Sequence, residues 1–293
     1  MKPRIAITAG DPAGIGPEIA AKAAADRRVL EVCQPIVYEA TPAGPFAMGE
    51  VSAVAGRAAF DAIVRAVDDA KAGKVDGIAT APVNKAAFAA AGLGWKGHTD
   101  LLAHLCGVGR VAMLFHSPKL RVVLATVHVP LRDVSRLLTR ELVRETLYLT
   151  AGELPYFGVK APRLAVAALN PHAGEGGLMG FEDDEVLAPA VRDAQQAGLD
   201  VSGPFPADTV FVRAARGEFD CVLACYHDQG LIPVKLLAFG TAVNVTLGLP
   251  IVRTSVDHGT AFDIAGRGLA DHGSLVEAVR LAAELATRVK EQS

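Results

Sequence analysis

The sequence predicts an α/β protein with two domains, in which mostly parallel sheets are covered by helices. Apolar runs alternate with helical patterns along nearly the whole chain, as in strand–helix–strand units. Several runs, such as 121–127 and 219–226, are apolar on both faces, which is typical of strands buried in a parallel sheet. The chain has 293 residues, of which 51% are apolar. It is therefore long enough for two compact units.

The first half of the chain begins with a short apolar strand, a turn of small residues and a helix. Pro17 suits the first turn of that helix. A long amphipathic pattern over 53–72 predicts a helix closed by Gly73, and the segment 39–49 predicts a connecting loop. The expected elements are strands 5–8, 77–80, 111–115 and 122–127, and helices 16–25, 53–72, 83–91 and 99–106.

The second half continues the alternation. Strand-like runs over 163–169 and 219–226 join the run at 121–127. Gly158 and Gly198 mark the expected ends of two of the helices, because glycine adopts the backbone conformation that ends a helix. The expected helices are 139–156, 183–197 and 275–290.

Composition excludes several classes of function. The net charge of −3 gives no broad electrostatic footprint for nucleic acid. No uncharged apolar stretch is long enough to span a membrane, and the N-terminal run is too short for a signal segment. The four cysteines form no CxxC pair, which favours reduced core thiols. We expect a cytoplasmic protein whose partners include neither nucleic acid nor membrane.

Three histidines each follow an apolar run and precede a Pro or Gly break: His128, His172 and His227. In open α/β sheets, ligands sit at the carboxyl ends of strands, and three imidazoles delivered there can share one divalent metal. Each histidine can equally be an ordinary loop residue. The gaps between them are far longer than in a compact motif such as HExxH. Pattern alone leaves both interpretations open.

Two further segments place polar groups at helix starts. The segment 8–18, TAGDPAGIGPE, is either a ligand-binding turn or an ordinary tight loop, and its glycines do not form GxGxxG. In the segment 96–100, KGHTD, Thr99 either caps a helix or joins His98 in binding an anionic substrate.

The region after His227 carries more candidate groups. Lys235, Asn244 and Arg253 are either surface residues or donors to a phosphate or carboxylate. The segment 255–268, SVDHGTAFDIAGRG, is either an ordinary polar loop or a loop that binds a nucleotide. Asp208 is predicted to enter a strand, as a cap or as a site carboxylate.

In combination, these segments resemble the 4-hydroxythreonine-4-phosphate dehydrogenase family. Two of them are also similar to loops of isocitrate and isopropylmalate dehydrogenases, which implies their two-domain fold with the active site in the cleft between the domains. The implied division is 1–112 with 256–293 as the nucleotide-side domain, and 113–255 as the metal-binding and dimerisation domain. The motifs are GDPAGIGPE, APVNK, GHTD, HVPLRD, LNPHAGEGG, GPFPADT, YHDQGLIPVK, NVTLGLP and RTSVDHGTAFDIAGRG.

The resemblance implies roles for individual residues. His128, His172 and His227 are expected to bind zinc, or magnesium or cobalt, at a homodimer interface, with His227 coming from the partner subunit. The substrate-binding positions are His98, Thr99, Lys235, Asn244 and Arg253. The positions expected to bind NAD or NADP are Gly14, His258, Gly259, Thr260, Ala261, Asp263, Ile264, Ala265 and Gly266.

The implied reaction is oxidation of 4-(phosphooxy)-L-threonine followed by loss of carbon dioxide, in vitamin B6 biosynthesis. Asp208 and Lys85 are candidates for the general base. Relatives acting on 4-phospho-threonate or phospho-erythronate, or on aromatic cis-diol dicarboxylates, are the nearest alternatives. The motifs GHTD and HDQGL favour the hydroxythreonine phosphate substrate over phospho-threonate and phospho-erythronate. The motifs NVTLGLP and RTSVDHG favour it over the aromatic cis-diol dicarboxylates. A metallohydrolase or a non-catalytic metal- or phosphate-binding protein is a further alternative. The region 37–54 is shorter than in longer family members.

Overall fold

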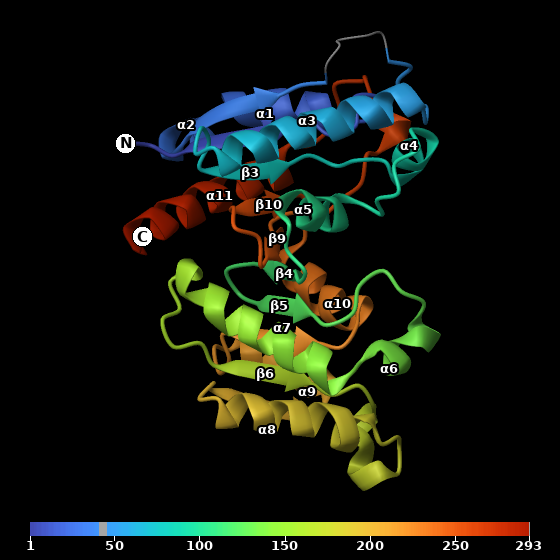
Figure 1. Cartoon of the computed structure of the whole chain (residues 1–293), viewed down its shortest axis with the longest axis vertical. Coiled ribbons are helices and arrows are strands. Elements are labelled where there is room, and N and C mark those ends of the chain that lie inside the picture. Colours follow the sequence, from blue (N-terminus) through green and yellow to red (C-terminus); the bar gives the residue numbers. More distant parts are fainter. Residues whose placement is uncertain (41–45, 293) are drawn as a thin grey trace. The chain divides into compact units, whose positions relative to one another are not determined.

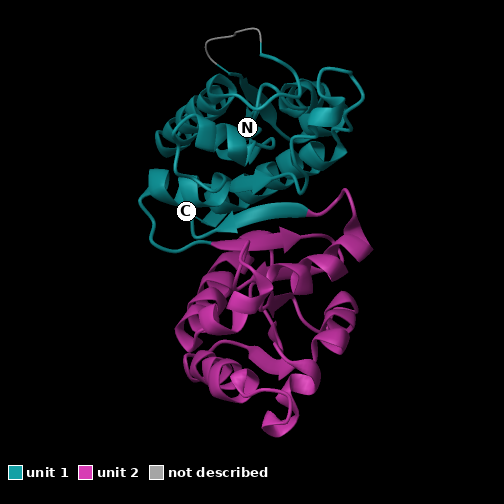
Figure 2. Cartoon of the chain, turned by 90° about the vertical axis from the view of Figure 1, so that its right-hand side faces the viewer, with its two compact units in different colours: residues 1–111, 243–293 teal, residues 112–242 magenta. Residues whose placement is uncertain are grey.

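A computed structural model describes residues 1–40 and 46–292. The predicted loop 39–49 therefore lies partly outside the described residues. The chain forms two compact units, residues 1–111 with 243–293 and residues 112–242 (Figure 2). Each unit is described separately below.

The strands of unit 1 follow the order β2-β1-β3-β10-β9. Figure 1 labels β3, β10 and β9. All pairings in this unit are parallel except that of β9 with β10. The carboxyl ends of β1, β3 and β10 consequently lie at one edge of the sheet. The strands are β1 (Arg4–Thr8), β2 (Gln34–Tyr38), β3 (Gly77–Thr80), β9 (Val243–Leu247) and β10 (Arg253–Ser255).

Helices cover both faces of this sheet. The hydroxyl of Thr254 donates to the carbonyl oxygen of Ala278 on α11, which places α11 on one face. On the other face, Ile63 of α3 and Leu101 of α5 pack in one apolar core with Ile78 of β3. The helices of unit 1 are α1 (Gly16–Ala25), α2 (Arg27–Val32), α3 (Ala53–Lys71), α4 (Lys85–Ala90), α5 (His98–Cys106), the short 3-10 helix η5 (Phe262–Ile264) and α11 (Gly273–Gln292).

In unit 2 the strands follow the order β4-β5-β8-β6-β7, and their pairings are parallel except that of β4 with β5. Its strands are β4 (Ala112–His116), β5 (Arg121–Leu124), β6 (Leu164–Ala167), β7 (Val201–Phe205) and β8 (Cys221–Ala224). β5, β8 and β6 are the strands that precede His128, His227 and His172.

The helices of unit 2 also pack on its sheet. Val210 of α9 and Val234 of α10 pack in one core with Val122 and Val222. The helical segments are η1 (Leu131–Asp133), α6 (Val134–Leu137), α7 (Arg140–Glu153), η2 (Leu154–Phe157), η3 (Pro171–Gly177), η4 (Asp183–Leu187), α8 (Ala188–Gln196), α9 (Ala207–Ala215) and α10 (His227–Ala238).

The predicted α/β class with mostly parallel sheets is confirmed, and two local predictions are wrong. Residues 243–255 belong to unit 1, because β10 pairs with β3 and β9 pairs with β10. Asp208 does not enter a strand: it lies in the first turn of α9, one turn after the end of β7. Val210 and Ala214 are buried at helical spacing there, a pattern too short to separate from a strand in the sequence.

Three glycines confirm their predicted role at helix ends. Gly73, Gly158 and Gly198 have positive φ angles as predicted, and so does Gly92, which follows α4. Among the described helices, none is both long and apolar enough to cross a lipid bilayer.

Candidate active site

His128 and His227 lie side by side in one chain. Their ring centroids are 5.5 Å apart. They follow β5 and β8, which are neighbouring parallel strands. His128 is exposed and His227 is half-buried as the first residue of α10. The pair is therefore open to a ligand.

The backbone explains why these two histidines meet. The ladder between β5 and β8 continues past both strands, with Ala125 N–H donating to Ala224 and Thr126 N–H donating to Cys225. The Thr126 hydroxyl adds a bond of 2.7 Å to the same Cys225 carbonyl oxygen. Each histidine follows two residues later. Nδ1 of His227 also lies 2.7 Å from the Asp228 carboxylate, which leaves its Nε2 for another partner.

His172 follows β6, the strand on the other side of β8, and is exposed. The segment before it is fixed by the buried Asp183 carboxylate, which accepts from the N–H groups of Leu169 and Asn170. After Asn170 the chain turns through six consecutive residues of positive φ, from His172 to Gly177.

Backbone strain is concentrated at the predicted site positions. In the described part of the chain, the non-glycine residues with positive φ are His128, His172, Ala173, Glu175 and Ala261. Each costs on the order of 1 kcal/mol or more, and such residues gather at functional sites. All five lie in the predicted metal or cofactor segments.

The described residues of a single chain contain no group of three histidine, cysteine or acidic side chains arranged to hold a metal ion. The structure thus brings together two of the three predicted ligands, His128 and His227. The pair predicted to share a subunit was His128 with His172, which is not the pair found adjacent.

The other predicted residues of unit 2 lie on helices. Asp208 is exposed on α9. Lys235 is on α10, where its ammonium lies 5.9 Å from the ring centroid of the exposed Phe239.

Arg253 is the most unusual charged residue of unit 1. It is only 2% exposed. Its Nη1 and Nη2 atoms donate to the hydroxyls of Thr246 (2.8 Å) and Thr80 (2.7 Å), whereas its Nε is buried without a partner. Among the described residues it has no carboxylate partner, and burial lowers the pKa of Arg253 to about 9. A buried cation without a counter-ion is costly, so the Arg253 guanidinium is suited to binding an anion.

Two more buried polar atoms without partners lie on residues near Arg253. They are Nε2 of His98 and Oδ1 of Asn244. Burial, and then the charge of Arg253, lower the pKa of His98 well below 6.5. His98 is therefore neutral at pH 7 and can exchange a hydrogen bond without adding charge. Thus Arg253, His98 and Asn244, all predicted from sequence, present unused polar atoms within one unit.

The start of α5 determines where His98 sits. Gly97 occupies the N-cap position, so Thr99 is the second helical residue and does not cap the helix. The Asp100 carboxylate accepts from the Lys96 N–H, which closes the preceding turn. Lys85 begins α4, and its Cε lies 3.8 Å from where a Cβ on Gly97 would be. Lys85 therefore passes next to His98, unlike the other candidate base, Asp208.

The two predicted cofactor segments pack against each other. Ile15 N–H donates to the carbonyl oxygen of Thr260 (3.0 Å), and a Cβ on Gly14 would lie 2.9 Å from Thr260. Ala261 begins η5 with a φ of 41°. The carbonyl oxygen of Gly259 lies 3.0 Å from His258 Nδ1. The segments are far apart in sequence, yet they form one surface at the carboxyl end of β1.

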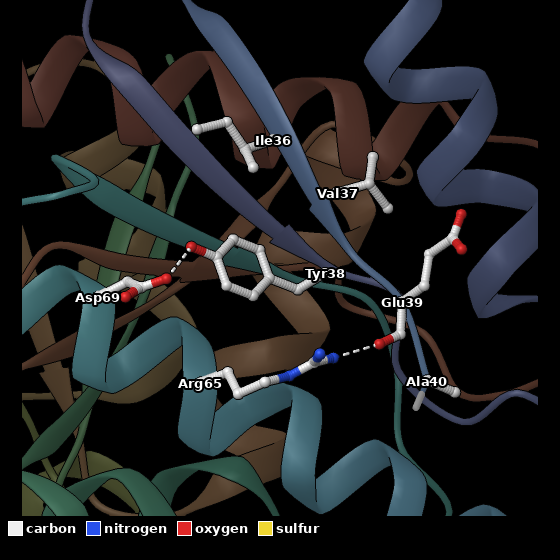
Figure 3. Close-up of a pocket in the computed structure, with 7 residues that line it drawn as sticks. All are labelled: Ile36, Val37, Tyr38, Glu39, Ala40, Arg65 and Asp69. Atoms are coloured by element: carbon white, nitrogen blue, oxygen red, sulfur yellow. Dashed lines mark hydrogen bonds between the residues drawn. The ribbon is translucent and has the colours of Figure 1, made fainter. Parts of the chain in front are cut away.

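A hollow of about 500 Å³ lies beside β2 and α3 (Figure 3). Its polar groups satisfy one another: Tyr38 donates to Asp69 (2.7 Å), and Arg65 donates to the carbonyl oxygen of Glu39. Burial and the Asp69 contact raise the pKa of Tyr38 to about 12. Because these groups already have partners, they are less suited to binding a ligand than Arg253, whose Nε has none.

Sequence reasoning missed the hydroxyls around Arg253. Thr80, Thr246 and Ser255 are all buried at or near the ends of short strands. The available signal was a Thr or Ser within an otherwise apolar strand, next to a Pro or Gly break. That signal is weak, because Thr is common in strands.

Comparisons with known proteins place the chain among oxidoreductases of the dehydrogenase type. The profile of the pyridoxal phosphate biosynthetic protein PdxA family matches residues 10–282. The chain belongs to this family. It is 46% identical to a D-threonate 4-phosphate dehydrogenase from Cupriavidus necator, over 98% of each protein. It is 45% identical to a 4-hydroxythreonine-4-phosphate dehydrogenase from Desulforapulum autotrophicum, over 98% of this chain and 96% of that protein.

Comparison with solved structures agrees with this family assignment. A 4-hydroxythreonine-4-phosphate dehydrogenase from Klebsiella pneumoniae superposes with a TM-score of 0.88 at 40% identity, covering 98% of both chains. An isocitrate dehydrogenase from Methylococcus capsulatus shares the fold alone, with 14% identity, a TM-score of 0.51, and coverage of 100% of this chain and 86% of that one. The alignments with the two curated relatives span 328 and 327 positions, so those relatives contain stretches that this chain of 293 residues lacks.

Proposed function

We propose that the protein oxidises 4-(phosphooxy)-L-threonine at C3 with NAD or NADP. The product, 2-amino-3-oxo-4-(phosphooxy)butanoate, loses carbon dioxide to give 3-amino-2-oxopropyl phosphate, a step toward pyridoxine 5'-phosphate. The observation that carries the proposal is the buried Arg253, whose described partners are hydroxyls only. In a family of dehydrogenases, such a site is suited to the anionic end of a phosphorylated hydroxy acid.

Residues of unit 1 would bind the phosphate. Arg253 supplies the charge, while the neutral His98 and the amide of Asn244 offer unused polar atoms. Thr99 adds a hydroxyl next to His98. Lys235, on α10 of unit 2, stays a predicted substrate-binding cation. Binding energy from the phosphate, which does not react, then helps to position C3.

His128 and His227 fit a divalent metal. With metal–nitrogen bonds of about 2.1 Å and a tetrahedral angle, two imidazole centroids would lie roughly 5 Å apart. The observed separation is 5.5 Å. A zinc, magnesium or cobalt ion bound there supplies Lewis-acid stabilisation for the negative charge that develops on the C3 oxygen. Two histidines leave room for a third protein ligand, which we assign to His172 of a second copy.

Exposed apolar side chains near His172 and His227 support a homodimer. Leu178 and Phe181, which follow His172, are 84% and 61% exposed. Ile232, Leu236 and Phe239 form an exposed stripe on α10, behind His227. Exposed apolar groups at this spacing are typical of a helix that packs against a partner. A second copy covering them would bring its own His172 segment to the interface.

The surface formed by Gly14 and residues 258–266 is assigned to the dinucleotide. It combines a small residue, a strained Ala261 and exposed polar groups at the carboxyl end of β1. NAD or NADP bound there supplies the hydride acceptor. Lys85 is the preferred general base over Asp208, because it passes next to His98.

A second candidate substrate is D-threonate 4-phosphate. It is favoured by the 46% identity to the Cupriavidus necator enzyme that acts on it. The two substrates share the phosphate and differ at C2, which carries an amino group in one and a hydroxyl in the other. Arg253 would bind the phosphate of both, so it does not distinguish the two substrates.

Steady-state kinetics with both substrates tests the proposal. The purified protein would be assayed with each substrate, with NAD and with NADP, in the presence of Zn²⁺, Mg²⁺ or Co²⁺, following NADH or NADPH absorbance. We expect kcat/KM to be about tenfold or more higher for 4-(phosphooxy)-L-threonine. The reverse order would assign the protein to D-threonate 4-phosphate. Turnover of neither would contradict both.

A further inference from the structure

Three neighbouring strands of unit 1 place polar side chains on one face of the sheet. Thr80 pairs with Ser255, and Ser255 pairs with Asn244. Paired residues point to the same side, as do residues two apart along a strand. Arg253 and Thr246 therefore lie on this face too. In Figure 1 it is the region where β3, β10 and β9 adjoin α5.

Arg253 is held from both sides on this face. Thr80 on β3 accepts from Nη2, and Thr246 on β9 accepts from Nη1. Two fixed contacts determine the plane of the guanidinium, because its donors form a rigid fork. The remaining donor, Nε–H, has no partner.

The hydroxyl of Thr80 is itself fixed. A guanidinium can only donate, so Thr80 must accept from Arg253 and donate elsewhere. Its Oγ1 lies 2.9 Å from the Ser255 hydroxyl, which in turn lies 3.3 Å from the carbonyl oxygen of Thr80. Arg253 thus donates to the Thr80 hydroxyl, which donates to the Ser255 hydroxyl, which donates to the backbone carbonyl oxygen of Thr80.

We propose that Thr80 and Thr246 are positioning residues, which hold the Arg253 guanidinium so that its Nε–H is kept for the phosphate of the substrate. Neutral hydroxyls do this without neutralising the cation, whereas a carboxylate in their place would compete with the phosphate. The inference rests on the proposed function for the identity of the substrate, but the anion pocket can be tested without turnover.

The test uses substitutions that remove one hydroxyl. Thr80→Val and Thr246→Val remove an acceptor from Arg253, and Thr80→Ser restores the hydroxyl without the methyl group. Thr254→Val is the matched control: this buried threonine is the neighbour of Arg253 in β10, but its hydroxyl donates to α11 on the opposite face. For each protein we would measure kcat and KM, and the Kd of inorganic phosphate by calorimetry.

We expect Thr80→Val to raise both the KM for the phosphorylated substrate and the Kd of phosphate about tenfold, with kcat changed less than about twofold. Thr80→Ser and Thr254→Val should remain within about twofold of the parent. Ser255→Ala, which removes only the next link, should give a smaller rise. It provides the comparison if Thr80→Val does not fold.

Four results would overturn the inference. One is an unchanged KM and phosphate Kd in Thr80→Val and Thr246→Val, or in Ser255→Ala when Thr80→Val does not fold. Another is an equal rise in Thr254→Val, which would show a general effect on the sheet. A third is failure of Thr80→Ser to restore binding. The last is an equal loss of kcat/KM by Thr80→Val with unphosphorylated 4-hydroxythreonine, because Arg253 would then hold another group.

The experiments distinguish a failure of the proposed function from a failure of the positioning role. If the parent oxidises neither substrate while Thr80→Val still weakens phosphate binding, the proposed function is wrong and the positioning role stands. If the parent oxidises the substrate and the valine variants match it, the positioning role is wrong.

Discussion

The imidazole rings of His128 and His227 lie 5.5 Å apart within a single chain. Because β5 and β8 are adjacent, this pairing needs no partner subunit. The metal site was predicted to receive His227 from the partner, whereas we propose that it takes His128 and His227 from one chain. If two ligands come from one chain, the histidine contributed by the partner is His172.

Removing either ring of this pair is expected to abolish metal binding. His128→Ala and His227→Ala each remove one of two nitrogen ligands, and affinity should fall about 100-fold or more. Metal per chain would be measured by elemental analysis after dialysis. His104→Ala is the matched control, because that imidazole is exposed and packs on Trp95 in unit 1. Full metal content in both unit 2 variants would contradict the assignment.

Mixing inactive variants is expected to show which chain supplies each histidine. In a dimer of His128→Ala with His172→Ala, one site receives His128 and His227 from one chain and His172 from the other, so activity should return. A mixture of His128→Ala with His227→Ala should stay inactive, since every site then lacks one of the pair.

The opposite outcome has a clear meaning. Recovery with His128→Ala plus His227→Ala, and none with His128→Ala plus His172→Ala, would restore the arrangement in which His227 crosses the interface. No recovery in either mixture would place all three ligands in one chain. Dimer exchange would be checked with differently tagged subunits.

Much of the fold follows from local patterns in the sequence. The apolar runs before the three histidines are β5, β6 and β8, and the glycines expected to end helices do so. What local patterns could not supply is strand order. The order β5-β8-β6 places His227 next to His128, although 99 positions separate them. Such pairing depends on the whole sheet, not on any local segment.

The same reason explains which site residues were missed. Arg253 was predicted because it follows an apolar run, but its main partner, Thr80, lies 173 positions away. Asp208 was assigned to a strand because the helical period cannot be recognised in so short a segment. Short strands such as β9 and β10 were also hard to assign, and this moved the predicted domain boundary.

The half-buried His98, whose Nε2 is buried, should make the protein less stable in mild acid. Because the pKa of His98 in the folded protein is well below 6.5, the unfolded chain binds a proton below that pH and the folded one does not. Stability therefore falls as pH decreases through 6.5, by up to about 1.4 kcal/mol per pH unit for this group. In His98→Gln that component should disappear. Denaturant unfolding between pH 5 and 8 would measure it.

The comparison of the parent with His98→Gln is controlled by the measurements at high pH. Above about pH 7.5, both states hold His98 neutral, so the parent and His98→Gln should show parallel pH dependence. If the two proteins stay parallel down to pH 5, His98 is protonated in the folded protein and does not stay neutral beside Arg253.

The contact between Gly14 and Thr260 should be necessary for the dinucleotide surface. A Cβ at position 14 would lie 2.9 Å from both Cβ and the carbonyl oxygen of Thr260, closer than such atoms pack. In Gly14→Ala the two segments must separate, at a cost of about 1–3 kcal/mol, and the KM for NAD or NADP should rise about fivefold or more. Gly94→Ala is the matched control, since nothing lies within 4 Å of its added Cβ. Because the phosphate pocket is built from other strands, the Kd of inorganic phosphate should not change in either variant. A KM for the dinucleotide that is the same in Gly14→Ala and Gly94→Ala would show that the dinucleotide does not bind at this surface.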